Sequence, residues 1–203
     1  MSEIEWAEPA DDAAVADFIF ELLARTNGGR IAVPGGSTPR PILKMLADRP
    51  LPWDQVTITV SDDREVPHDH PASNFGALRS VLGATGALLE PLVAGQMPGR
   101  FHLVWAGMGN DGHVASIFPN MQIDMDARPS IIRETPDPLP PEAPFPRLTL
   151  NYSALTNTER LILVVRGDTK KAILEEAIAG RNDLPVARLL SRAHCPVTLF
   201  WNP

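Results

Sequence analysis

The chain of 203 residues is 44% hydrophobic, which suffices for one α/β-sized core and not for two. Its formal net charge of −7 argues against nucleic acid or an anionic membrane as the main partner, whereas a small anionic ligand responds to the charge of its own pocket. The single cysteine, Cys195, excludes an intrachain disulfide and cysteine-rich zinc sites. The acidic first residues lack a signal-peptide pattern, and no apolar stretch approaches the ~20 residues of a membrane helix, so we expect a soluble cytoplasmic protein.

Hydrophobic periodicity predicts helices that alternate with short strands. In chain order we expect a helix at 11–26, a strand at 30–33, a helix at 40–48, a strand at 56–60, a helix at 73–83, strands at 100–107 and 160–165, helices at 168–180 and 185–193, and a strand at 196–201. Asp11 or Asp12 is expected to cap the first helix, and Asp168 the fourth. This alternation is typical of an α/β fold with a mostly parallel sheet and helices on both faces, Rossmann-like in architecture. We therefore expect a single domain over residues 1–203, with its ligand at the carboxyl ends of the strands.

A proline-rich segment at residues 129–146 interrupts this alternation. It holds seven prolines, so we expect neither a regular helix nor a central strand there. A linker between two domains would have a similar composition, but the sequences on both sides share one α/β pattern. We therefore interpret the segment as an extended loop over the surface.

The sequence AVPGGSTPR, residues 32–40, has the layout of an anion-binding turn between a strand and a helix. Gly35 and Gly36 allow a tight turn and a close approach of the backbone to a ligand. Ser37 and Thr38 add hydroxyl and N–H groups, and the proline after them suits the first position of a helix. A plain helix cap would use the same residue types. The glycine spacing excludes a dinucleotide-binding fingerprint and a P-loop.

A second polar cluster follows the apolar run VTITV. Asp62, Asp63 and Arg64 stand at the carboxyl end of this expected strand, where an arginine can bind an anion through two hydrogen bonds. The alternative is a solvated charge cluster in a loop. His68 and His70 follow two residues apart, but no third metal ligand stands at a recognisable spacing, so we interpret both as loop residues.

The third cluster, GMGNDGHVASIFP at residues 107–119, follows the apolar run FHLVWA. A histidine at the end of a strand and the start of a short helix suits a general base, because imidazole titrates close to neutral pH. His113 holds this position, Asp111 is close enough to orient or polarise its ring, and glycine N–H groups nearby could stabilise an oxyanion. The alternative is a turn with a capping aspartate and an incidental histidine.

In this order and spacing, GGSTP, SDDREVPHDHPASN and GMGNDGHVASIFP resemble the signature blocks of the 6-phosphogluconolactonases, whose superfamily also includes the glucosamine-6-phosphate isomerases/deaminases. PRLTLN at 146–151 and GDTKKA at 167–172 agree with the same family. The resemblance implies hydrolysis of 6-phospho-D-glucono-1,5-lactone to 6-phosphogluconate, in the pentose phosphate and Entner–Doudoroff routes of carbohydrate metabolism. It also implies no metal, no organic cofactor, a small phosphosugar lactone as the partner, and a monomer or small homo-oligomer.

By this resemblance, His113 is the base that activates the attacking water, and Asp62 orients the base or the water. Arg64 would bind anionic or hydroxyl groups of the substrate. The phosphate would be held by the turn at Gly35, Gly36, Ser37 and Thr38 and by Lys170, with Arg147 as a further candidate. Asp63 stands where the family usually has glutamate.

Two other functions compete with lactone hydrolysis. An amino-sugar-phosphate isomerase/deaminase of the same superfamily typically has Asn-Glu-Pro after the histidine, where this chain has Ile117 and Phe118. The acid needed for ring opening is therefore not supplied at that place, and we favour the lactonase. A non-catalytic phosphosugar-binding regulator would have no need for the base at His113.

Overall fold

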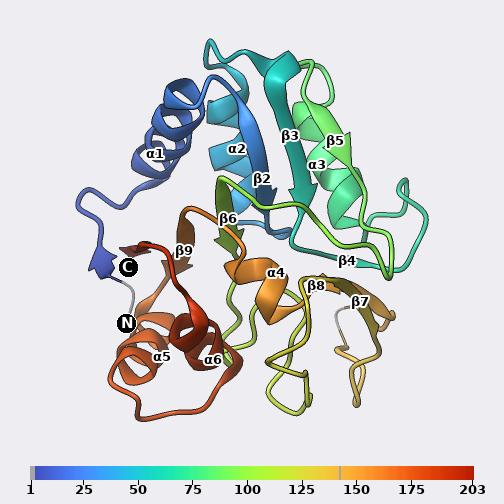
Figure 1. The fold of residues 1–203 in the computed structure, drawn as a ribbon, viewed down its shortest axis with the longest axis vertical. Helices are drawn as coiled ribbons and strands as arrows, with labels where there is room; N and C mark the ends of the chain where they lie inside the picture. Colours follow the sequence, from blue (N-terminus) through green and yellow to red (C-terminus); the bar gives the residue numbers. More distant parts are fainter. Residues whose placement is uncertain (1–2, 142) are drawn as a thin grey trace.

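The computed structural model describes residues 3–141 and 143–203, and within them the centre of the molecule is a seven-stranded sheet (Figure 1). In spatial order its strands are β1 (Ile4–Trp6), β10 (Val197–Asn202), β9 (Leu161–Arg166), β6 (Leu103–Ala106), β2 (Gly29–Val33), β3 (Val56–Val60) and β5 (Leu88–Glu90). All neighbouring strands pair in parallel. The predicted parallel α/β architecture is confirmed, although the two short edge strands β1 and β5 were not predicted.

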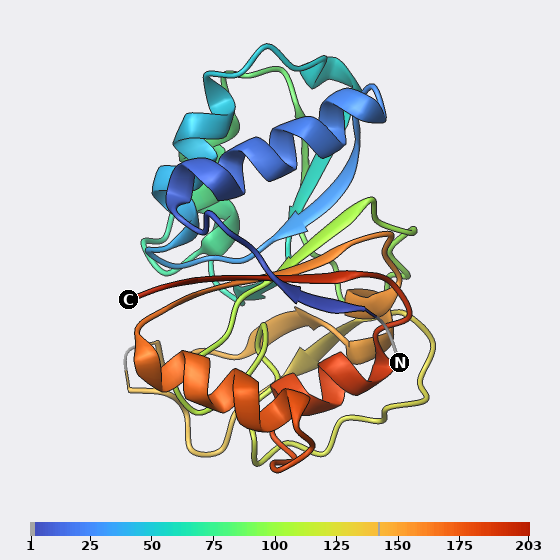
Figure 2. The same cartoon turned by 90° about the vertical axis from the view of Figure 1, so that its left-hand side faces the viewer.

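Helices cover both faces of this sheet, as Figure 2 shows. One face carries α1 (Asp12–Arg25), α2 (Pro39–Ala47) and α3 (Asn74–Leu82), and the other carries α4 (Tyr152–Thr156), α5 (Asp168–Ile178) and α6 (Pro185–Arg192). A short 3-10 helix, η1 (Trp53–Gln55), precedes β3. None of the helices in the described ranges is long and apolar enough to cross a membrane.

One of the two predicted aspartate caps is present in the structure. Asp11 caps α1 as predicted, since its carboxylate accepts a hydrogen bond from the N–H of Ala14 at 2.8 Å. The predicted aspartate cap of α5 is wrong: Gly167 is the N-cap, and Asp168 is the first helical residue. The sharp turn out of β9 ends one residue earlier than expected, and Asp168 instead adds its negative charge to the first turn, where the helix dipole favours it.

The central strands are buried on both faces, which explains their continuous apolar sequences. All four residues of β6 are buried, and Trp105 within it is among the largest fully buried side chains. Ile58 of β3 and Leu163 of β9 are also fully buried. Burying one such side chain contributes about 1.5–3 kcal/mol, so these strands form a rigid base for the loops that leave their carboxyl ends.

The strand order reverses between β2 and β6. After β2 the chain continues to β3 on one side, whereas after β6 it continues to β9 on the other side. The loops that leave β2 and β6 therefore diverge and open a crevice at the carboxyl end of the sheet. In parallel α/β sheets this reversal point is where ligands bind.

A second, antiparallel sheet extends beside this crevice. It consists of β4 (Asp62–Arg64), β8 (Arg147–Leu150) and β7 (Ile131–Glu134), in that spatial order. The loop predicted for the whole of 129–146 is therefore wrong at β7, which lies in a proline-free stretch and is an edge strand, the place in a sheet that tolerates prolines nearby. Position 142 of this segment lies outside the described residues.

Candidate active site

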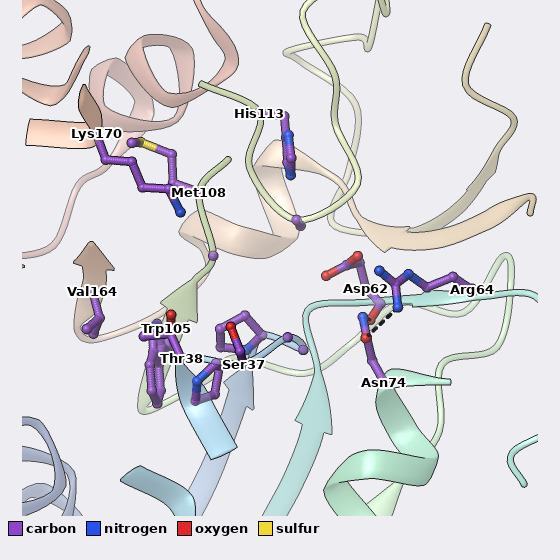
Figure 3. Close-up of a pocket in the computed structure, with 16 residues that line it drawn as sticks. Ser37, Thr38, Asp62, Arg64, Asn74, Trp105, Met108, His113, Val164 and Lys170 are labelled. Carbon is purple, nitrogen blue, oxygen red and sulfur yellow. Dashed lines mark hydrogen bonds between the residues drawn. The ribbon is translucent and has the colours of Figure 1, made fainter. Parts of the chain in front are cut away.

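Two adjoining cavities open where the loops after β2, β3, β6 and β9 meet. The first has a volume of about 270 Å³ and is lined by Gly35, Gly36, Ser37, Thr38, Asp62, Arg64, His113 and Lys170, among others (Figure 3). The second, of about 440 Å³, shares Asp62, Arg64 and His113 with the first and adds Asp111 and Arg147. The fold thus brings every predicted site residue to one or both cavities, although they come from five separate parts of the sequence.

Asp111 and His113 form a hydrogen-bonded pair. Their Oδ1 and Nδ1 atoms are 2.6 Å apart, and the same Oδ1 accepts the backbone N–H of His113 at 3.2 Å. Since an ionised carboxylate only accepts hydrogen bonds, Nδ1 carries the proton in the neutral ring and Nε2 keeps its free lone pair. The ring also stacks on Phe118, with the ring centres 4.7 Å apart.

The loop that carries this pair is a tight turn, and no helix forms there. Val114 bridges to both Met108 and Ile117, so the short helix predicted after His113 is wrong. Gly109 lies so close to the imidazole that a Cβ there would be 2.2 Å from Cε1 of His113. The N–H groups of Gly109 and Gly112 already donate to the carbonyls of His113 and Gly109, so these two cannot serve as oxyanion donors, contrary to our expectation.

The turn at residues 35–38 faces the first cavity from the side opposite His113 (Figure 3). Pro39 begins α2 as predicted, but the Thr38 side chain makes no capping hydrogen bond within the described part of the chain. A plain helix cap therefore does not account for this residue. Gly35 lies against Asn74, where a Cβ would come within 2.0 Å of Oδ1, so a larger residue would push this turn away from the site.

Asp62 is buried between the two cavities, with 8% of its surface exposed. One carboxylate oxygen accepts the hydroxyl of Ser61 at 3.1 Å, and the other accepts the hydroxyl of Ser116 at 2.6 Å. The backbone N–H of Ser116 donates to the Thr149 hydroxyl at 3.2 Å, which fixes its position. The carboxylate is therefore held in place and is not part of a solvated loop cluster, the alternative considered above.

Asp63 has a structural position at the start of α3. Its carboxylate accepts hydrogen bonds from the N–H groups of Arg64, Asn74 and Phe75 and from the hydroxyl of Ser73, over 2.6 to 3.1 Å. This satisfies the free N–H groups at the start of the helix, where a negative charge is also favoured. Asp63 thereby holds the loop from β4 to α3 against the site without lining either cavity.

Two cationic side chains reach the cavities, Arg147 buried and Lys170 partly buried. Burial lowers the pKa of Lys170 below its usual 10.5, while the negative charge of Asp111 raises it. Burial and then the charge of Arg64 lower the pKa of Arg147, whereas Asp62 and Asp63 raise it. Burial thus disfavours the charged form of both side chains, and an anionic ligand in the cavities would favour it.

Arg64 and Asn74 are held together beside the cavities. The Nη1 atom of Arg64 donates to the carbonyl of Ala72 at 2.9 Å and to Oδ1 of Asn74 at 3.2 Å. Asn74 in turn donates through Nδ2 to the backbone carbonyl of Asp62 at 2.8 Å. Asn74 and Ser116 both lie within the sequence blocks quoted above, but the sequence did not single them out, because their partners are distant in the chain.

His68 and His70 of the second block contact neighbouring loop and helix residues, in agreement with their interpretation as loop residues. His70 accepts the N–H of Ala72 through Nδ1 at 3.1 Å, and His68 packs edge-on against Phe75. Over residues 3–141 and 143–203, no three histidine, cysteine or carboxylate side chains gather as metal ligands would.

Comparison with known proteins places this site in a family. A family model described as glucosamine-6-phosphate isomerases/6-phosphogluconolactonase matches residues 10–91 and 83–201. A 6-phosphogluconolactonase from Caulobacter vibrioides is 34% identical and aligns over 94% of this chain and 91% of its own length. A crystal structure of a 6-phosphogluconolactonase from Shewanella baltica has a TM-score of 0.82 and 25% identity, covering 100% of this chain and 98% of its own.

A more distant structure shows how far the fold extends. A monomeric glucosamine-6-phosphate deaminase has a TM-score of 0.76 over 98% of this chain and 97% of its own, at 12% identity, so the likeness concerns the fold alone. The family model and the sequence identity to the Caulobacter protein cover nearly the whole chain. The chain therefore belongs to the glucosamine-6-phosphate isomerase/6-phosphogluconolactonase family.

Proposed function

We propose that the chain hydrolyses 6-phospho-D-glucono-1,5-lactone to 6-phosphogluconate. The observation that carries this proposal is the Asp111–His113 pair, 2.6 Å apart, on the wall of a cavity that also presents Asp62, Lys170 and the turn at 35–38. This set supplies a base, a fixed carboxylate and cationic and N–H groups for a phosphate. Attack of water on an ester carbonyl needs a base and a positioned water, and the phosphate-binding groups would fix the substrate beside them.

The reaction begins at Nε2 of His113. Because Nδ1–H donates a hydrogen bond to Asp111, Nε2 is free to take a proton from a water molecule, whose oxygen attacks the C1 carbonyl of the lactone. Each oxygen of Asp62 still has a free lone pair beside its serine partner, so the carboxylate can accept the other hydrogen of this water. The C1–O5 bond then breaks, and O5 takes the proton from Nε2.

Phosphate binding at the opposite side of the first cavity would fix the substrate. The N–H groups at the start of α2 favour an anion, and Ser37 and Thr38 add hydroxyl donors. Lys170 supplies a positive charge from the start of α5. Arg64 and Arg147 remain candidates for anionic groups of the substrate, as the sequence predicts.

Apolar side chains after the histidine support lactone hydrolysis over amino-sugar isomerisation. Ile117 is 1% exposed, and Phe118 stacks on the imidazole, so neither position offers an acid for ring opening. We further propose that residues 1–203 act as one lactonase domain in the cytoplasm, without metal or organic cofactor, in the pentose phosphate or Entner–Doudoroff route. That the chain has no nucleic acid partner, and that it is a monomer or a small homo-oligomer, stay predictions.

The test is lactone hydrolysis with 6-phosphogluconolactone generated in situ, at mildly acidic pH where spontaneous hydrolysis is slow. We expect acceleration by the wild type and a fall in kcat of about 100- to 10,000-fold in His113→Ala, the usual contribution of a general base. His194→Ala is the matched control, because this exposed histidine precedes β10 at the opposite end of the sheet. Activity should survive a metal chelator.

The outcomes separate the candidate functions. Acceleration that is lost in His113→Ala and kept in His194→Ala supports the proposal. A wild type that binds 6-phosphogluconate without accelerating hydrolysis would indicate a regulator, and turnover of glucosamine 6-phosphate would indicate an isomerase/deaminase. Equal losses of binding and activity in His113→Ala would show that the imidazole binds substrate and does not activate water.

A further inference from the structure

Arg64 and Arg147 lie directly opposite each other across two strands. They are register partners in the antiparallel pair of β4 and β8, and both side chains line the second cavity. Like charges directly opposite on one face of a sheet destabilise the pair. A protein that keeps two guanidinium groups in this arrangement needs something to compensate their repulsion.

The hydrogen bonds of Arg147 are incomplete. This residue is 3% exposed, and its Nη2 atom donates to the carbonyl of Ala143 at 2.8 Å. Its Nη1 atom is buried and finds no hydrogen-bond partner among the described residues. A buried donor on a charged group that lacks an acceptor is costly, so this atom indicates a missing anionic or carbonyl oxygen.

The carboxylates nearby do not fill this role. Asp62 and Asp111 also line the second cavity, so its formal charges balance. The oxygens of Asp62, however, are bound by the hydroxyls of Ser61 and Ser116, and Oδ1 of Asp111 is bound by His113. Neither acid accepts a hydrogen bond from Nη1 of Arg147, so an oxygen of a bound ligand would complete this donor.

The two cavities place this donor apart from the turn at 35–38 and Lys170, which together we call the phosphate cradle. The first cavity holds the turn at 35–38 and Lys170, the second holds Arg147, and His113 lines both. A substrate with its phosphate in the first cavity therefore has its reacting carbon near His113 and the groups beyond that carbon in the second. The hydrolysis product is anionic at both ends, whereas the lactone is anionic only at its phosphate.

We propose that Arg64 and Arg147 form a carboxylate subsite that holds C1 of the open-chain sugar acid, separate from the phosphate cradle. This rests on the proposed lactone hydrolysis. When water adds to C1, the former carbonyl oxygen becomes negative and lies beside these arginines. When the C1–O5 bond breaks, C1 becomes a carboxylic acid, which releases a proton to solvent and leaves a carboxylate between the two guanidinium groups.

A binding comparison tests this subsite. The probes are 6-phosphogluconate, which carries both anions, and glucitol 6-phosphate, which has the same open chain with a neutral C1 hydroxyl. We expect the wild type to bind 6-phosphogluconate at least about 10-fold more tightly, since a charge-assisted contact in a water-poor site accounts for such a ratio. Equal affinities for the two probes would overturn the proposal without any variant.

The variants then assign the effect to the arginine. Arg147→Met should weaken 6-phosphogluconate by about 10- to 100-fold and change glucitol 6-phosphate by less than about 3-fold. Lys170→Met should weaken both probes. Arg133→Met is the control, because this exposed arginine belongs to the same small sheet, pairs with Glu65 and lines neither cavity. A thermal melt checks that Arg147→Met is folded, and Arg147→Lys replaces it if it is not.

Two results would refute the subsite. Equal weakening of both probes by Arg147→Met would assign Arg147 to the phosphate, and unchanged binding of both would make it a structural residue. Lactone hydrolysis measured on the same preparations separates this proposal from the activity itself. Hydrolysis without a preference for the acid refutes only the subsite, and a preference without hydrolysis refutes only the proposed function.

Discussion

The hydrogen bond from His113 to Asp111 gives a graded prediction for catalysis. In Asp111→Asn the amide oxygen can still accept the Nδ1 proton, but as a neutral acceptor. Charge-assisted hydrogen bonds contribute about 1.5–3 kcal/mol and neutral ones about 0.5–1.5 kcal/mol, a difference of about 1–1.5 kcal/mol. Because the Asp111 side chain is 51% exposed, solvent screening favours the lower value, about 1 kcal/mol.

This free energy converts to rates through the factor of ten for each ~1.4 kcal/mol of barrier. We expect kcat to fall about 5-fold in Asp111→Asn and about 10- to 100-fold in Asp111→Ala, which removes the acceptor altogether. KM should change little near neutral pH. The charge of Asp111 raises the pKa of Lys170, so Asp111→Asn should lower that pKa. Lys170 would then lose its positive charge at a lower pH than in the wild type, and KM should begin to rise at that lower pH.

The assay is steady-state lactone hydrolysis across pH, with Asp124→Asn as the control. Asp124 is exposed and accepts the N–H of the residue two positions on at 2.9 Å, the same local hydrogen bond as that of Asp111, but it lines neither cavity. A kcat in Asp111→Ala equal to that of the wild type would show that Asp111 closes the turn and does nothing for the base. A fall in kcat in Asp111→Asn as large as in His113→Ala would contradict the contribution of about 1 kcal/mol assigned to the charge of Asp111.

Three further predictions concern stability. Asp63→Ala should lower the free energy of unfolding by about 3–5 kcal/mol in urea titration, because the N–H of Arg64 and three donors at the start of α3 lose their acceptor; a loss under about 1 kcal/mol would contradict this role. Ser116→Ala should cost about 1–3 kcal/mol and also reduce kcat by freeing Asp62, while Ser116→Thr keeps the hydroxyl and should retain both. Lys170→Met should stabilise the fold at pH 7, because the folded-state pKa of Lys170 lies below 10.5 and the charged lysine therefore destabilises the fold at low pH. This destabilisation is lost as the pH rises from the folded-state pKa toward 10.5, so the gain in stability should shrink over that window. A gain that does not depend on pH would indicate a packing effect.

The carboxyl-edge rule explains why so much of the site could be predicted. Each polar cluster stood directly after an apolar run, and in a parallel sheet those positions share one edge. The rule needs only the strands and their direction, so the turn at 35–38, Asp62 and His113 could be assigned to one place without any distance being known, whereas Lys170 was assigned through the resemblance to the family. Their common position is confirmed by the two cavities, whereas their individual roles stay predictions.

The second sheet could not be predicted, because its pairing is long-range. β4 is three residues long and pairs with β8, which follows more than eighty positions later. Side chains alternate along a strand, so Asp62 and Arg64 face the cavities while Asp63 faces α3. Without the strand assignment, the sequence did not show that Asp63 faces away from the cavities. The same pairing brings Arg64 opposite Arg147, which the sequence treated as unrelated residues.

Some departures from the local rules of folding lie at the two cavities, and there they mark residues that serve the site more than the fold. Two non-glycine residues in the described ranges have a positive φ. Asn27 follows a helix, and asparagine tolerates a positive φ there. Ala115, with φ of +49°, lines both cavities. Arg147 has a buried donor without an acceptor, and Lys170 is partly desolvated. A fold selected for stability alone would replace these side chains by apolar ones of similar size. An anion bound in the cavities would supply the missing acceptor and the missing charge, so the free energy that these groups cost the empty protein is recovered when the ligand binds.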